Sequence, residues 1–310
     1  MDLSHILFSH FSNEREKLSK MEGLRLAYYT DASTAIEILK NECVWMRNTT
    51  LMNDYGEIKH GERAVSEFFS MHNPRAKQFW DVLNRLFPDI FYELDHYYSS
   101  WSDDLNWNTF VTSVSIHTPE EDELGRLSMW RAYGRNTGVA LVFKPDIFFS
   151  EEDNLQAYSY PALYWNKGRI ISEFERIIDN VTSNIDILAS STGEEVKSLL
   201  IHLFHSFAIS LKHPGFEEEK EWRIIFRPTK SPKSPLEKSV ETISGVPQII
   251  YKIPLKEKFK TAPSQLLDRI IIGPSEHSWE VRDAFATLLI DLGLSDLAKK
   301  IVVSGIPLRN

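Results

Sequence analysis

The order of strand-like and helix-like runs is the feature that most constrains the fold of this chain. Short apolar runs with strand character alternate irregularly with longer helical patterns, and no regular strand–helix–strand repeat connects them. This order favours the α+β class, with a mixed, mainly antiparallel or split β-sheet as the core, over a doubly wound parallel sheet. Strands are predicted at 25–30, 44–46, 107–115, 137–144, 157–165, 221–227, 249–254, 269–273 and 300–304.

Two helical segments interrupt the predicted strands. Apolar residues recur at spacings of three and four over 57–101, where Pro74 and Pro88 divide the pattern. Residues 168–190 and 194–212 predict two further helices, the second opened by the capping-box pattern Thr192-x-x-Glu195. We therefore expect an N-terminal helix or arm over 1–22, followed by one α+β domain over 23–310 with the helical segments 57–101 and 168–212 inserted.

Charge and cysteine usage narrow the compartment and the class of partner. The net charge of −9 argues against general coating of DNA, which needs a positive field. The lone Cys43 rules out a disulfide within the chain and is expected to be a buried thiol. The N-terminus is too polar for a signal peptide, and no apolar run approaches the length of a membrane helix. We expect a cytoplasmic protein with no membrane contact.

The stretch Lys212–Arg227 carries the strongest local conflict in the sequence. A run of acids and one lysine, 217–221, leads directly into an apolar strand pattern. An ionised glutamate next to an apolar core is costly unless it is paired or hydrogen-bonded. On a strand, Glu221 and Arg223 share one face and Trp222 lies on the other. We expect the polar face to line a cleft and the apolar face to pack in the core, although residues 217–219 also fit an ordinary solvated turn.

Common catalytic and metal motifs do not occur in this chain. We find no GxGxxG, P-loop, CxxC, HExxH or GxSxG pattern, so no metal site is predicted. The most basic stretch is 228–239, rich in Pro, Lys and Ser, and it is expected to be a mobile loop that contacts phosphate through Lys230, Lys233 and Lys238. A nucleic acid is therefore one candidate macromolecular partner.

Six motifs in order identify a resemblance that covers nearly the whole chain. They are YYT (28–30), LMND with Glu57 (51–57), SMWRAYG followed by GVALVF (128–143), EKEWRI (219–224), RIIIGP (269–274) and SGIP (304–307). The set resembles a widespread family of bacterial and prophage proteins classed as a domain of unknown function. Members often lie near defence genes, which implies a role in phage defence or as a toxin, and a partner protein from a defence operon.

A more distant resemblance concerns the opening strand, helix and strand. This pattern is similar to the start of ADP-ribosyltransferase-like folds, including the DNA-modifying toxin branch. Those folds carry an Arg or His on the first strand, an aromatic or hydroxyl residue midway and a Glu on a late strand. The resemblance assigns these roles to Arg25 or to Tyr29 with Thr30, then to Ser115 or Tyr133, then to Glu221, while Glu219-Lys220-Glu221 is the nearest match to a Glu-x-Glu turn.

The resemblance implies NAD as the substrate that donates the ADP-ribosyl group. Cleavage of its glycosidic bond passes through an oxocarbenium-like state, which a carboxylate stabilises electrostatically. The expected catalytic residues are Glu221 and Glu219. The expected NAD-binding residues are Arg25, Arg131 and Arg223 for phosphate, Tyr29, Trp130 and Tyr133 for the flat rings, and Thr30, Asn53 and Asp54 for hydroxyl groups and the loop edge.

Two other functions fit the same sequence, and several candidate residues also fit purely structural roles. Core packing is the competing interpretation for Trp130 and Trp222, and a turn that caps a helix is the competing interpretation for Asn53 and Asp54. A non-catalytic module that recognises a nucleotide or nucleic acid by stacking is the first alternative function. A metal-dependent nuclease is the second, and it would require carboxylates that converge on one point.

Overall fold

The computed structural model describes residues 3–51, 55–145, 148, 157–228, 234, 236–243, 245–255 and 266–307, with residues 4, 55, 57 and 99–106 described by their backbone alone. The chain divides into two compact units, each assembled from separate stretches of sequence. The first comprises Met1–Lys17, Asn48–Thr109 and Tyr160–Glu217, and the second Leu18–Arg47, Phe110–Ser159 and Glu218–Asn310. The single domain predicted over 23–310 and the arm over 1–22 stay predictions.

The first unit is mainly helical in its described part. Pro74 occupies the first turn of α5, where its missing N–H leaves one fewer unpaired donor, and Asn73 caps the helix. The predicted capping box of Thr192 and Glu195 opens α11 and satisfies backbone N–H groups at its start. The segment predicted as one helix over 168–190 is instead two, α9 and α10. Its elements are α1 (Leu3–Leu7), α2 (Ser9–Ser19, which extends past the unit), η1 (Thr49–Leu51), α4 (Tyr55–Phe68), α5 (Pro74–Leu86), α6 (Ile90–Trp107), α9 (Lys167–Ser183), α10 (Ile185–Ala189) and α11 (Gly193–Ser210).

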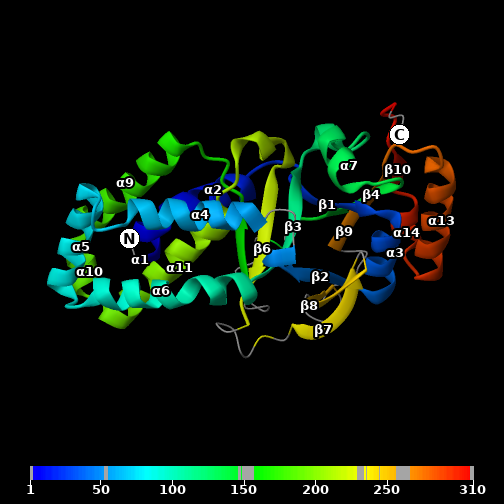
Figure 1. Cartoon of the computed structure of the whole chain (residues 1–310). Helices are drawn as coiled ribbons and strands as arrows, with labels where there is room; N and C mark the ends of the chain where they lie inside the picture. Colours follow the sequence, from blue (N-terminus) through cyan, green and yellow to red (C-terminus); the bar gives the residue numbers. More distant parts are fainter. Residues whose placement is uncertain are drawn as a thin grey trace. The chain divides into compact units, whose positions relative to one another are not determined.

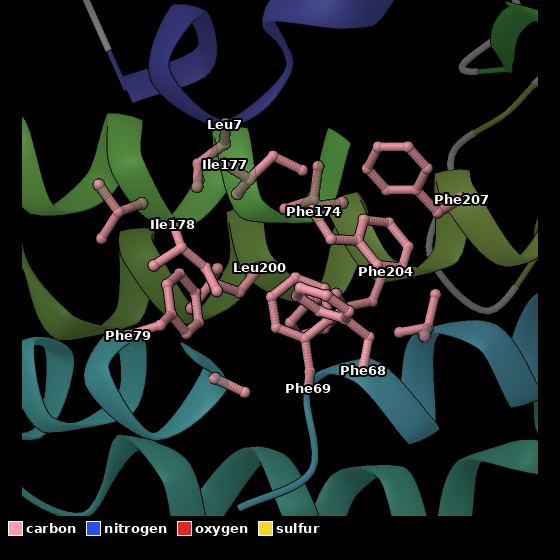
Figure 2. Close-up of a cluster of buried hydrophobic side chains, with 14 of the residues drawn as sticks. Leu7, Phe68, Phe69, Phe79, Phe174, Ile177, Ile178, Leu200, Phe204 and Phe207 are labelled. Atoms are coloured by element: carbon pink, nitrogen blue, oxygen red, sulfur yellow. The ribbon is translucent and has the colours of Figure 1, made fainter. Parts of the chain in front are cut away.

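Phenylalanine rings dominate the core of the helical unit. Phe69, Phe174, Phe204 and Phe207 point toward one another between α4, α9 and α11, as Figure 2 shows. Their ring centroids lie about one ring diameter apart in tilted and edge-to-face arrangements, such as 4.6 Å between Phe69 and Phe204. The predicted helical periodicity therefore corresponds to a real apolar face on each long helix.

The second unit is built on a β-sheet whose described strands run in the order β10-β9-β4-β1-β3-β2-β8-β7, with β6 pairing with β3 and β5 pairing with β6. Every pairing with a recorded register is antiparallel except β9 with β10, which confirms the mainly antiparallel α+β prediction. The strands are β1 (Arg25–Asp31), β2 (Cys43–Asn48), β3 (Phe110–His117), β4 (Gly138–Phe143), β5 (Tyr158–Pro161), β6 (Glu221–Phe226), β7 (Glu237–Ile243), β8 (Val246–Pro254), β9 (Leu267–Ile272) and β10 (Ile301–Val303).

Helices cover both faces of this sheet. One apolar face packs against α3 (Ala32–Asn41) and α13 (Ser278–Asp291), and the other, which includes Ala27 and Tyr29, packs against α7 (Leu127–Tyr133). In Figure 1, α13 and α14 (Ser295–Ala298) lie beside β9 and β10. Asp31 ends β1 and caps α3 by accepting a hydrogen bond from the Thr34 amide at 2.8 Å.

Two further predictions of local structure are wrong. The strand predicted from Trp107 begins only at Phe110, because α6 continues through Trp107, whose carbonyl accepts a hydrogen bond from the Asn48 side chain at 2.7 Å. The loop predicted over 228–239 ends early, because Glu237 already opens β7, which pairs with β8. The predicted burial of Cys43 is confirmed, and burial raises the pKa of its thiol.

Candidate functional site

The strands β1 and β3 separate part of the way along their length. They pair only from Arg25–Ala27 to Ser115–His117, while the rest of β1 pairs with β4 alone. One edge of β3 is occupied by β6 over Phe110–Ser115, so β1 and β2, its other two neighbours, share the opposite edge. We call the place after Ala27, where β1 leaves β3, the fork.

The backbone of β1 turns hydrogen-bonding groups toward the fork. The Ile116 amide donates to the Lys220 carbonyl on the β6 side, at 2.8 Å. Because backbone groups alternate between the two edges of a strand, those of Ser115 and Ala27 face each other, and Tyr29, two residues further along β1, points the same way. The fork therefore presents a backbone donor and acceptor beyond the last strand pair, and buried groups of this kind require a partner.

Glu221 lies on β6 in a buried ion pair. Its carboxylate accepts hydrogen bonds from the Ser113 hydroxyl, from Arg223 Nε at 2.9 Å and from Arg223 Nη2 at 3.0 Å. Glu221 is 5 % exposed and Arg223 is 4 % exposed, while Trp222 between them is fully buried on the opposite face. The predicted strand faces are confirmed, and the predicted conflict is resolved because the carboxylate is paired with a bidentate guanidinium.

Glu219 differs from Glu221 in exposure, although only one residue separates them. Lys220 has a positive φ of 42°, which is unusual for a residue with a side chain and which turns the chain just before β6. The half-buried Glu219 carboxylate accepts a hydrogen bond from the Tyr133 hydroxyl at 3.2 Å. Its carbonyl accepts one from the Ser115 hydroxyl at 2.5 Å. The turn therefore keeps one carboxylate accessible and the next one buried.

Arg126, which the sequence interpretation missed, connects this turn to the rest of the unit. Its Nη1 donates to the carbonyls of Glu218 and Glu219 at 2.9 and 3.1 Å and to the Ser115 hydroxyl at 2.5 Å. Its Nε and Nη2 both donate to Glu121, at 2.8 and 2.6 Å. The sequence signal that could have pointed here is the Thr118-x-x-Glu121 capping-box pattern.

Tyr29 and Trp130 pack together beside Arg126. The Tyr29 hydroxyl accepts a hydrogen bond from the Arg126 amide at 3.0 Å, and burial raises the pKa of Tyr29 to about 12. Its ring meets Trp130 edge-on, with centroids 4.7 Å apart. Trp130 is 2 % exposed and its indole N–H donates to the Leu124 carbonyl at 2.9 Å, so the core-packing interpretation describes its environment.

The remaining predicted NAD-binding residues are Arg25, Thr30, Arg131, Asn53 and Asp54. Arg25 forms ion pairs with Asp122 at 2.7 Å and with Asp268 at 3.0 Å, and Thr30 is buried on the sheet face opposite Tyr29. Arg131 is exposed on α7. Asn53 and Asp54 lie outside the described residues, as do Lys230 and Lys233, whereas Lys238 is exposed on β7.

A buried histidine belongs to the same charged cluster as Arg25. His117 Nε2 lies 3.0 Å from Asp122 Oδ1, and His117 Nδ1 lies 3.8 Å from Glu121 Oε2. Burial lowers the pKa of His117, opposed by its hydrogen bond to Asp122. Because Glu121 also holds Arg126, this cluster is continuous with the Glu219 turn.

Polar side chains also line the opposite side of the fork. Burial raises the pKa of Tyr28. The positive charge of Arg47 and the hydrogen bond between the Tyr28 hydroxyl and Thr112 oppose this rise. Arg47 Nε donates to Gln248 Oε1 at 3.1 Å, and burial lowers the pKa of the Arg47 guanidinium. The fork is therefore flanked by hydroxyl, amide and guanidinium groups from four strands.

Among the described residues, no three His, Cys, Asp or Glu side chains gather in a group that could hold a metal ion. None of the described helices is long and apolar enough to cross a membrane.

The comparison with protein families gives one match. The model of a family described as "Protein of unknown function (DUF2971)" matches residues 129–224. This confirms, over those residues, the predicted resemblance to a domain of unknown function, and the matched stretch includes Tyr133, Glu219 and Glu221. The searches of curated proteins and of solved structures find no match.

Proposed function

We propose that this chain is an NAD-dependent, ADP-ribosyltransferase-like enzyme that modifies a macromolecule, either a nucleic acid or a protein. One observation carries the proposal: the Glu219-Lys220-Glu221 turn is hydrogen-bonded to Ser113 and Ser115 of β3 at the point where β3 leaves β1. A separation of two strands gives a ligand access to backbone groups, and an adjacent pair of carboxylates supplies the charge that the reaction needs.

The reaction breaks the bond between the anomeric carbon of the ribose and the nicotinamide nitrogen. Nicotinamide leaves with the electron pair of that bond, and an oxygen or nitrogen of the acceptor attacks the same carbon and loses its proton. The positive charge that develops on the ribose is stabilised by a nearby carboxylate. Glu219 fits this contact because it is half-buried and oriented by Tyr133, while the buried Glu221 anchors the strand through Ser113 and Arg223.

The fork also offers groups that suit the rest of NAD. The nicotinamide carboxamide carries one acceptor and one donor group, which complement the backbone N–H and C=O that Tyr29 turns toward the fork. The exposed Arg131, two residues before Tyr133 on α7, suits a bidentate contact with the pyrophosphate. Arg25 contributes less in this proposal because Asp122 and Asp268 already hold its guanidinium.

Release of nicotinamide tests this proposal. Purified protein is mixed with NAD alone and with DNA, RNA or bacterial extract, and nicotinamide is measured by chromatography. Glu219→Gln and Glu221→Gln are expected to abolish release, whereas Glu218→Gln is the matched control, because Glu218 is exposed and contributes only its carbonyl to the turn. Release that survives Glu219→Gln would contradict the assignment.

A second function is favoured by the burial of Glu221. Both oxygens of its carboxylate already have partners, as expected of a structural ion pair. A non-catalytic module for recognising a nucleotide or nucleic acid would keep the fork without turnover. This function predicts that NAD or a single-stranded oligonucleotide raises the melting temperature without nicotinamide release, and that Lys238→Glu weakens oligonucleotide binding while Glu219→Gln does not.

A role in phage defence or as a toxin is a further part of the proposal. It rests on the resemblance to a family of bacterial and prophage proteins. If the enzyme modifies a cellular macromolecule, its expression in bacteria should slow growth, and Glu219→Gln should restore growth at equal protein level. A partner protein would be sought by co-purification from the native host.

A further inference from the structure

We infer that Arg126 is a positioning residue for Glu219, which deepens the proposed function and rests on it. Arg126 does not need to touch substrate for this role. Its guanidinium holds the backbone on which Glu219 is mounted, through the carbonyls of Glu218 and Glu219 and through the hydroxyl of Ser115.

The turn before β6 needs an external support because its own geometry is unfavourable. Three acidic side chains follow one another over 217–219, and their like charges repel. Lys220 then adopts a positive φ of 42°, which costs on the order of 1 kcal/mol for a residue with a side chain. The carbonyls of Glu218 and Glu219 lie at the end of the 3₁₀ turn Pro214–Glu219, where carbonyl groups lack partners within the helix. Arg126 supplies those partners.

Arg126 is itself fixed from the other side. Glu121 accepts from both Nε and Nη2 through one oxygen, while its other oxygen accepts from the Thr118 amide at 3.1 Å in the capping box. The Arg126 amide is meanwhile bonded to the Tyr29 hydroxyl on β1. Through Arg126, hydrogen bonds therefore connect both β1 and the 3₁₀ turn Pro119–Glu121 to the carbonyl of Glu219.

Arginine suits this arrangement because its guanidinium is planar and carries several N–H donors in fixed directions. The guanidinium reaches acceptors on both sides at once, whereas a lysine ammonium is a single point charge that cannot span Glu121 and the Glu219 carbonyl in fixed directions. Arg126→Lys should therefore preserve the charge while releasing the turn. A displacement of about 1 Å in a reacting group costs roughly a hundredfold in rate, so we expect kcat to fall by that order while KM changes little.

Hydrogen exchange tests the positioning role without any assumption about activity. The Ile116 amide reports on the turn directly, because it donates to the Lys220 carbonyl at 2.8 Å. In Arg126→Lys, we expect at least tenfold faster exchange at Ile116 and over 218–221, with unchanged exchange in β4. Arg282→Lys is the matched control, because Arg282 lies on α13 in the same unit and pairs with the neighbouring Asp283 at 2.8 Å. Ser115→Ala removes one donor to the Glu219 carbonyl and should give a smaller increase at the same amides.

The outcomes separate this inference from the proposed function. Unchanged exchange over 218–221 in Arg126→Lys, or faster exchange that includes β4 to the same extent, would overturn the positioning role, because the effect would be absent or global. Faster local exchange together with lost nicotinamide release and an unchanged KM supports both. If exchange is faster locally in Arg126→Lys but the wild type releases no nicotinamide, Arg126 still holds the turn and the proposed function is contradicted.

Discussion

Replacing Glu221 with glutamine should destabilise the protein strongly, although the two side chains have nearly the same shape. Glu221 and Arg223 are 5 % and 4 % exposed, so the substitution neutralises a buried carboxylate that accepts hydrogen bonds from the guanidinium at 2.9 and 3.0 Å. Removing one member of a buried ion pair typically costs about 3–5 kcal/mol. Glutamine keeps one oxygen that can accept from Ser113, so we expect a loss near the lower limit, about 3 kcal/mol.

Glu219→Gln is the matched comparison because it makes the same chemical change two residues away. Glu219 is half-buried, and its carboxylate has a hydrogen bond from Tyr133 at 3.2 Å. Glutamine retains an acceptor for that bond, so we expect a loss of less than about 1 kcal/mol. We therefore expect Glu221→Gln to lower the free energy of unfolding more than Glu219→Gln does, because Glu221 is the more buried of the two.

Urea unfolding followed by tryptophan fluorescence and circular dichroism measures both variants. The midpoint for Glu221→Gln should shift to clearly lower urea than the midpoint for Glu219→Gln. The double variant Glu221→Gln with Arg223→Met removes both charges of the buried pair and should recover part of the loss, giving a coupling energy above about 1 kcal/mol. Equal midpoints for the two single variants would refute the burial argument.

Two other predictions concern a helix contact and a titration. Gly61→Ala should destabilise the helical unit by about 3 kcal/mol, because the added Cβ would lie 2.2 Å from the Ala208 carbonyl oxygen. Gly56→Ala in the same helix is the control, because its Cβ would meet no described atom within 4 Å. In thermal unfolding, this control should be more stable than the wild type by up to about 1 kcal/mol. Burial lowers the pKa of His117, so the unfolded chain binds more protons below about pH 6.5, and stability should decline as the pH falls from there. His117→Gln should flatten the decline in melting temperature between pH 7 and 5.5, and an unchanged slope would contradict this source of the pH dependence.

Local patterns in the sequence were sufficient to predict most of the regular elements. The apolar run of β4 and the alternation of Glu221, Trp222 and Arg223 on β6 gave the correct strands, since burial on one or both faces dictates residue type along a strand. The hairpin strand β7 was missed because its residues are mostly exposed and polar, and its strand conformation depends on pairing with β8.

The candidate site was predictable only where the residues are close in sequence. Glu219, Glu221 and Arg223 form one local pattern, and their proximity followed from strand geometry. The fork depends on pairing between strands that are far apart in the chain, so no local spacing reveals it. The capping box before Arg126 marks a local turn, but it does not show that the Arg126 guanidinium reaches the carbonyls of Glu218 and Glu219, 92 and 93 residues away. The same applies to the ion pairs of Arg25 with Asp122 and Asp268, the latter 243 residues away, while its expected phosphate contact stays a prediction.

Transfer of labelled ADP-ribose is the most direct test of the central claim. NAD labelled in its adenylate phosphate is incubated with the protein and with DNA, RNA or extract, and label is followed into the macromolecular fraction. We expect transfer by the wild type and by Glu218→Gln, and a loss of at least about a hundredfold in Glu219→Gln. Absence of transfer to every acceptor, together with no effect of NAD on the melting temperature, would contradict the proposal that the fork binds NAD.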